Sequence, residues 1–196
     1  MRKNEGAGKE IADKRYLTVL TTTFLLLLTS CVGTLTTQNY ATYDKNSALF
    51  SKYNDVNKIN IGLFSMSSDM ITDTIQCRLN DQIKVPNGKS SYAEYIRKAF
   101  IAEFTRANLY SSSAPLSLSA KINNISLSTF GSATWVISLT IFSSNGRSVT
   151  IDETYTFKTT FDANTTCYNA AFYFVYAVQD LIGKALLDPN FILLMK

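Results

Sequence analysis

Residues 135–157 read WVISLTIFSSNGRSVTIDETYTF, and this stretch decides the fold. Apolar and polar residues alternate on both sides of a central Ser-Ser-Asn-Gly, which predicts two antiparallel strands joined by a tight turn. A two-residue turn would oppose Ile141 with Thr150 and set apolar residues against polar ones. A three-residue loop over residues 144–146 opposes Ile141 with Val149, so the apolar faces match and we predict this register.

The hairpin has one misfit, and a third strand precedes it. In the matched register Glu153 falls on the apolar face, opposite Ile137. Residues 116–127 also alternate, but their apolar parity shifts at Asn123-Asn124, which predicts a bulge in that strand.

Two helices are predicted from apolar residues at helical spacing, one on each side of these strands. The first begins at Ser91, whose spacing from Glu94 is that of a capping box. The last is capped by Thr165 or Thr166 and is stopped by Pro189.

The first half of the last helix is apolar nearly all round, so it is either deeply buried or offers a surface to a partner. A short apolar tail follows it and either lies along the sheet or binds a partner. The candidate contact residues on this flank and tail are Phe172, Tyr173, Tyr176, Phe191 and Leu193.

Upstream of the first helix, residues 56–64 predict a first strand, and residues 71–79 a second, short strand that carries Cys77. The aliphatic members assigned to the first strand are Val56, Ile59, Ile61 and Leu63. The order predicts an α+β fold: a two-layer, open, mainly antiparallel sheet of four to five strands with two helices packed on one face.

The N-terminus resembles a bacterial lipoprotein signal. A basic pair precedes an apolar run over residues 16–28, and residues 28–31 read Leu-Thr-Ser-Cys, like a lipobox. Cys31 is then the lipidation site and the first residue of the mature chain. The alternative is a transmembrane helix, but this run is shorter than the roughly 20 residues that a span needs.

This signal predicts three regions. Residues 1–30 form the signal peptide, residues 31–55 the lipidated cysteine and a flexible tether, and residues 56–196 a single α+β periplasmic domain. As a free coil the tether would reach roughly 25–30 Å. Alternatively, its tyrosines pack on the domain.

Composition excludes several function classes. The sequence has no histidine, which excludes His-dependent triads, His general bases and His-ligated metals. Removal of residues 1–30 leaves 14 basic and 12 acidic side chains, scattered along the chain, so nucleic acid is not an expected partner.

Cys77 and Cys167 remain after Cys31 is assigned to lipid. We expect a disulfide between them in an oxidising compartment; two separate buried thiols are the alternative. The sequence has no phosphate-binding loop, GxSxG elbow, HExxH or Ser-x-x-Lys motif, so we expect no enzyme, cofactor or metal.

The layout is similar to that of small envelope lipoproteins: YajG-like lipoproteins, lipopolysaccharide-assembly lipoproteins and auxiliary lipoproteins of ABC-type transport systems. The stretches that carry the resemblance are Tyr95 to Tyr110, Ser143 to Gly146, Thr154 to Phe157 and Ala177 to Phe191. It implies a non-catalytic accessory or scaffold of a membrane assembly or transport complex. Such a protein is anchored by acyl chains on Cys31, in the outer membrane facing the periplasm, and has an envelope protein partner. The alternative is a periplasmic binding protein for an apolar ligand or envelope polymer.

Overall fold

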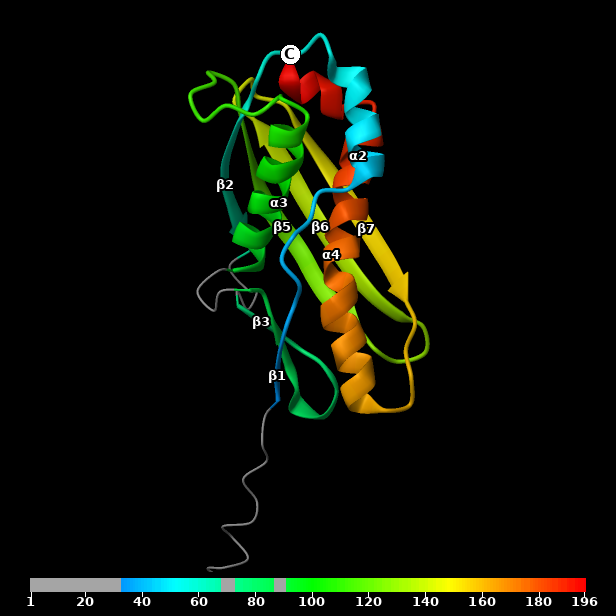
Figure 1. The fold of residues 1–196 in the computed structure, drawn as a ribbon. Helices are drawn as coiled ribbons and strands as arrows, with labels where there is room; N and C mark the ends of the chain where they lie inside the picture. Colours follow the sequence, from blue (N-terminus) through cyan, green and yellow to red (C-terminus); the bar gives the residue numbers. More distant parts are fainter. Residues whose placement is uncertain (1–32, 68–72, 87–90) are drawn as a thin grey trace, which may run out of the picture. The chain divides into compact units, whose positions relative to one another are not determined.

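The computed structural model describes residues 33–67, 73–86 and 91–196 (Figure 1). The elements in chain order, with η for a short 3-10 helix, are β1 (Thr34–Thr36), α2 (Asp44–Leu49), η1 (Phe50–Tyr53), β2 (Asn60–Met66), β3 (Thr74–Gln76), η2 (Arg78–Asn80), β4 (Gln82–Lys84), α3 (Tyr92–Arg106), β5 (Ser117–Ser128), β6 (Ala133–Ser143), β7 (Ser148–Phe157), α4 (Ala163–Leu187) and η3 (Phe191–Met195).

The predicted α+β class is confirmed. A four-stranded sheet in the order β2-β5-β6-β7 carries α3 and α4 on one face (Figure 1). β2 runs parallel to β5, and the other pairs of this sheet are antiparallel. The predicted strand over residues 71–79 is present as β3, but it is shorter and ends before Cys77, which directly precedes η2. It belongs to a second sheet, β1-β4-β3, so the expectation of a single sheet is wrong. β1, β4 and the short helix α2 were not predicted.

The predicted hairpin register is confirmed. Ile141 lies opposite Val149, and the Ser143 amide donates to the Arg147 carbonyl at 2.8 Å, which leaves a three-residue loop. Gly146 has a φ of +87°, in the left-handed region that glycine adopts without strain.

Glu153, the misfit of the hairpin, is buried at 6% exposure opposite Ile137. The ammonium group of Lys184, on α4, lies 3.1 Å from its carboxylate. The lysine comes from the helix that covers this face, so the sheet register and the placement of α4 support each other.

Two strands contain bulges, one predicted and one not. The shift between Ile122 and Asn124 confirms the bulge in β5. A second shift, between Ile61 and Phe64, rotates β2 so that Phe64 is buried while Leu63 is 74% exposed. The assignment of Leu63 to the apolar face is therefore wrong, because one irregular step reverses the side-chain alternation.

The helix ends show one confirmation and one correction. Ser91 caps α3 by accepting a hydrogen bond from the Glu94 amide at 3.2 Å. α4 is capped by Asp162, whose carboxylate accepts from the Thr165 amide at 2.6 Å, so the predicted threonine cap is wrong. Thr165 lies within the first turn and supplies the donor rather than the acceptor.

Among the residues that the structure describes, α4 is a helix long and apolar enough to cross a membrane. Of its most apolar window, 61% is buried inside the domain. Its apolar character is thus explained by packing: Phe174, at its centre, is fully buried against Trp135, with ring centroids 4.9 Å apart.

The expectation of a flexible tether after Cys31 is wrong for the residues described, because residues 33–55 are packed on the domain. β1 pairs with β4, and α2 lies against α4. Phe50 and Tyr53 are 4% and 2% exposed, and the Phe50 ring lies 4.9 Å from that of Phe104. The alternative, in which the tyrosines of this segment pack on the domain, holds for Tyr40 and Tyr53.

A buried polar cluster holds this N-terminal segment in place; we call it the Glu103 cluster, and it consists of Tyr40, Asn46, Glu103 and Gln179. Glu103, on α3, has no exposed surface and accepts hydrogen bonds from the Tyr40 hydroxyl at 2.5 Å and the Tyr43 amide at 2.9 Å. The Asn46 amide group donates to the Gln179 carbonyl of α4 at 2.9 Å. Burial raises the pKa of Tyr40, and the bond to Glu103 adds to this shift, so Tyr40 stays protonated.

Replacement of Glu103 by Ala tests this docking. It leaves the Tyr40 hydroxyl and the Tyr43 amide without their acceptor, so we expect a loss of roughly 1–3 kcal/mol of unfolding free energy. Amide hydrogen exchange over residues 40–53 rises more than over β5–β7. The matched control is Glu94→Ala, which removes a half-exposed carboxylate of the same helix that is ion-paired with Arg97. Equal effects of the two substitutions would contradict the assigned role of Glu103.

Candidate functional site

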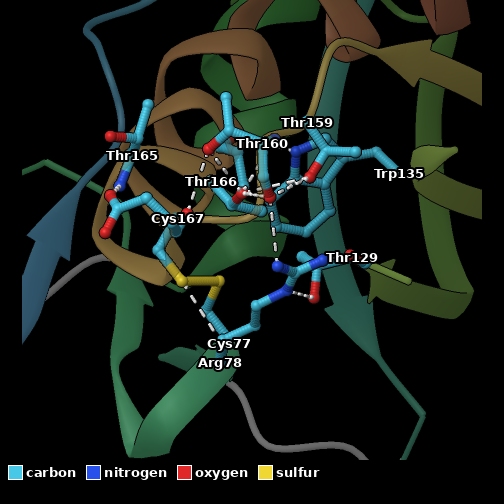
Figure 2. Close-up of a disulfide and its surroundings, with 11 residues drawn as sticks. Cys77, Arg78, Thr129, Trp135, Thr159, Thr160, Thr165, Thr166 and Cys167 are labelled. Atoms are coloured by element: carbon cyan, nitrogen blue, oxygen red, sulfur yellow. Dashed lines mark hydrogen bonds between the residues drawn. A yellow bond between two sulfur atoms is a disulfide. The ribbon is translucent and has the colours of Figure 1, made fainter. Parts of the chain in front are cut away.

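The predicted disulfide is present and joins two distant parts of the domain (Figure 2). Cys77, at the start of η2, is bonded to Cys167 in the first turns of α4, with 5.9 Å between their Cα atoms. The Arg78 amide donates to the Cys167 sulfur at 3.3 Å. The bridge therefore ties the loop between the two small-sheet strands β3 and β4 to the main helix.

Arg78 extends this connection to two more loops (Figure 2). Its guanidinium donates to the Thr129 hydroxyl at 3.2 Å and to the Thr129 carbonyl, in the β5–β6 turn. It also donates to the Thr160 carbonyl at 3.2 Å, in the β7–α4 loop. One side chain next to the disulfide thus holds two separate loops; we call the region of η2 and these loops the braced end.

Thr166 holds the β7–α4 loop through buried hydrogen bonds. It has no exposed surface, its hydroxyl donates to the Thr160 carbonyl at 2.9 Å, and it accepts from the Thr160 amide at 3.2 Å. Its neighbour in the chain is Cys167. The loop, the helix start and the disulfide form one rigid unit.

An open groove of about 510 Å³ adjoins the braced end, beside the edge strand β7. Its lining residues are Gly131, Ser132, Tyr155, Thr156, Phe157, Lys158, Thr159 and Tyr173. The Tyr173 ring stacks on that of Phe157 with centroids 5.5 Å apart. The lining therefore combines aromatic rings with hydroxyl groups and one lysine.

Of the five predicted contact residues, three lie on the flank of α4 and two lie in the tail. Phe172, Tyr173 and Tyr176 form an aromatic cluster on the flank of α4, with centroids of neighbouring rings 5.2–5.8 Å apart. Tyr176 and Leu193 are 37% and 39% exposed and remain available for contact.

Phe191 has no exposed surface, so its assignment to a contact surface is wrong. The tail forms η3, and the Phe191 ring lies 6.2 Å from that of Tyr53 in the core. Cys31, the predicted lipidation site, lies outside the described residues.

The groove residues Tyr155, Phe157 and Lys158 and the bracing residue Arg78 were not predicted as site residues. Tyr155 and Phe157 were assigned to a strand only, and nothing in the sequence marks Arg78 as different from other arginines. One signal in the sequence points to the braced end. Phe130 and Phe161 lie in polar turns, where apolar side chains are exposed.

Two ionisable groups on this side of the domain have shifted pKa values: Tyr155, which lines the groove, and Asp180 on α4. Burial raises the pKa of Tyr155, and it also raises the pKa of Asp180, which Lys45 and Lys184 partly oppose. Within the described residues no group of three or more acidic or cysteine side chains is placed to hold a metal ion. The arrangement is suited to contact through aromatic rings and hydrogen bonds.

Comparison with known proteins shows that this chain shares its fold with a solved structure. No protein-family model matches the sequence, and no curated protein is significantly similar to it. The solved structure of protein XCC0632 from Xanthomonas campestris, described under family model DUF330, superposes with a TM-score of 0.52. It is 10% identical in sequence, and the match covers 81% of this chain and 95% of that one. The structure of an uncharacterised protein matches with a TM-score of 0.46 at 8% identity, over 79% of this chain and 97% of that one. The chain therefore shares the fold of the DUF330 protein.

The disulfide is tested by replacing Cys77 and Cys167 together with Ala. The bond joins residues 90 positions apart, and loss of such a cross-link lowers the unfolding free energy by about 2–4 kcal/mol. Denaturant titration measures this loss, and reductant reproduces it in the parent protein but has no effect on the variant. Because Arg78 then loses its fixed position, hydrogen exchange in residues 159–162 rises. An unchanged unfolding midpoint would be inconsistent with this role.

Proposed function

We propose that this protein is a lipid-anchored, non-catalytic envelope lipoprotein that serves as an accessory or scaffold of a membrane assembly or transport complex. The anchor is a set of acyl chains on Cys31, and the domain faces the periplasm from the outer membrane. The observation that supports the role most directly is the open aromatic groove beside the edge strand β7.

The start of the folded domain supports an anchored arrangement. The Gly33 carbonyl accepts a hydrogen bond from the Gln82 amide at 2.9 Å, and β1 follows at once. Gly33 follows Cys31 by two positions, a span of at most about 7 Å. A domain acylated at Cys31 is thus held close to the membrane, where an accessory subunit meets integral membrane partners.

The contact surface supports a protein partner. Tyr173 lines the groove, and the rings of Phe172 and Tyr176 lie next to it on the flank of α4. Aromatic side chains are enriched in protein interfaces because they bury a large area with little conformational freedom to lose. An edge strand beside such a surface also suits pairing with an extended segment of a partner.

The second candidate function is binding of an apolar ligand or an envelope polymer, and the same groove favours it. Its volume of about 510 Å³ lies within the range of ligand sites, roughly 300–1,000 Å³. The groove is open rather than enclosed, which suits an extended polymer better than a small molecule.

The anchor is tested by Cys31→Ala. We expect this variant to leave the membrane fraction and to lose the acyl-chain mass found on the N-terminal peptide of the parent protein, because one cysteine carries the attachment. Fractionation and mass spectrometry measure both effects. Acylation that persists in the variant, or its absence from the parent, would refute the anchor.

The partner surface is tested by Tyr176→Glu in cells that carry a tagged, crosslinked copy. A charge at this ring weakens capture of an integral membrane partner about tenfold or more, the effect of losing an aromatic interface residue. Leu187→Glu is the control, since it lies on the same helix about 16 Å along the axis and is 57% exposed. If both variants keep the partner of the parent protein, with thermal unfolding unchanged, Tyr176 is not part of the contact surface. If the parent protein captures no membrane partner, the binding-protein alternative is favoured.

A further inference from the structure

The two most exposed aromatic side chains among the described residues lie on neighbouring loops of the braced end. Phe130, in the β5–β6 turn, is 83% exposed, and Phe161, in the β7–α4 loop, is fully exposed at 107%. The other large apolar side chains with substantial exposure are spread over several elements: Leu63, Phe142, Tyr168, Tyr176, Leu187 and Leu193. Exposed apolar side chains that gather on one part of a surface mark a site of contact with a partner or a membrane.

These two rings are held outwards by fixed backbone. Each follows a threonine that Arg78 binds: Thr129, which is 5% exposed, and Thr160. The guanidinium of Arg78 also lies over the Phe130 ring, 5.4 Å from its centroid. Since Arg78 is adjacent to the disulfide, the loops are pre-organised and little conformational freedom is lost when the rings are buried.

The chain enters the domain at this same end. Gly33 binds Gln82, and a side chain at Gly33 would overlap the Asp81 carboxylate, so the two segments are in close contact. The Asp81 amide in turn donates to the Arg78 carbonyl at 3.0 Å. The start of β1, the disulfide loop, the β5–β6 turn and the start of α4 all lie at the lower end in Figure 1.

The short distance along the chain between Cys31 and Gly33 indicates what covers the two rings. Cys31 lies within about 7 Å of Gly33 along the chain, so acyl chains on it hold the braced end against the bilayer. Phe side chains on membrane-surface segments insert into the boundary between headgroups and acyl chains. The neighbouring charges are of both signs, Arg78 and Lys158 with Asp81 and Asp162, so attraction to anionic lipid is not required.

We propose that Phe130 and Phe161 insert into the membrane interface beside the lipid anchor, so that the braced end rests on the bilayer and the groove is held at a fixed height above it. This inference rests on the proposed acylation of Cys31. It adds a second, non-covalent membrane contact and fixes the orientation of the domain, which an acyl anchor alone does not.

The test uses the full acylated protein in phosphatidylcholine vesicles with and without brominated acyl chains, which quench tryptophan at short range. Phe130→Trp and Phe161→Trp introduce the probes. The native Trp135 is fully buried, and its indole N–H donates to the Ala170 carbonyl at 2.9 Å, so it supplies a constant background that also reports folding. The control, Leu187→Trp, is exposed at the far end of α4, about 36 Å from the helix start.

We expect bromine to quench the added fluorescence of Phe130→Trp and Phe161→Trp, with a blue shift on vesicle binding, and to leave Leu187→Trp unaffected. If the vesicles carry acylated protein but neither loop probe is quenched, the inference is overturned while the anchor stands. If Cys31 carries no acyl chain, both the anchor and this contact are refuted. Equal quenching of all three probes would also overturn it, because the domain would then have no preferred orientation.

Discussion

The packing of Phe174 at the middle of α4 is the contact on which the rest of the domain depends. Its ring lies 5.1 Å from Tyr92 and 5.2 Å from Tyr95, both on α3, and 4.9 Å from Trp135 on β6. Both helices and the sheet therefore meet at one side chain. The same helix carries Cys167 at one end and Lys184 at the other, so the disulfide and the partner of Glu153 are positioned by this packing.

Local patterns in the sequence predicted the parts of the fold that depend on local rules. The hairpin register followed from face matching, because a wrong register would have set polar residues against Ile141 and its neighbours. The bulge at Asn123 and the cap at Ser91 followed from parity and spacing. The disulfide followed from the two cysteines left in a compartment that favours oxidation.

The elements that were missed have no local signal. β1 and β4 are three residues each, too short to show a period, and they exist because each pairs with a distant segment. Glu103 lies one turn after Ala99, on the buried side of α3, where the sequence alone offers no partner for a carboxylate. Its partners come from a segment that reads as a polar linker.

The candidate site likewise has parts with a local signal in the sequence and parts without one. The aromatic flank at Tyr173 and Tyr176 was predicted from the excess of apolar residues on α4, but the groove also needs β7 and the turn at Gly131, which only the tertiary structure brings together. Phe191 was misassigned because an apolar tail reads the same way whether it folds back into the core or stays outside.

The Glu103 cluster also sets an order in which the contacts of the domain form during folding. Asn46 finds its acceptors 57 and 133 residues further along the chain. During synthesis, the segment up to and including α2 is therefore among the first to emerge and among the last to find its contacts. Closing so long a loop is slow relative to formation of the local β5–β7 meander. The contacts of α2 with Glu103 and Gln179 are therefore complete only after the final helix has been made.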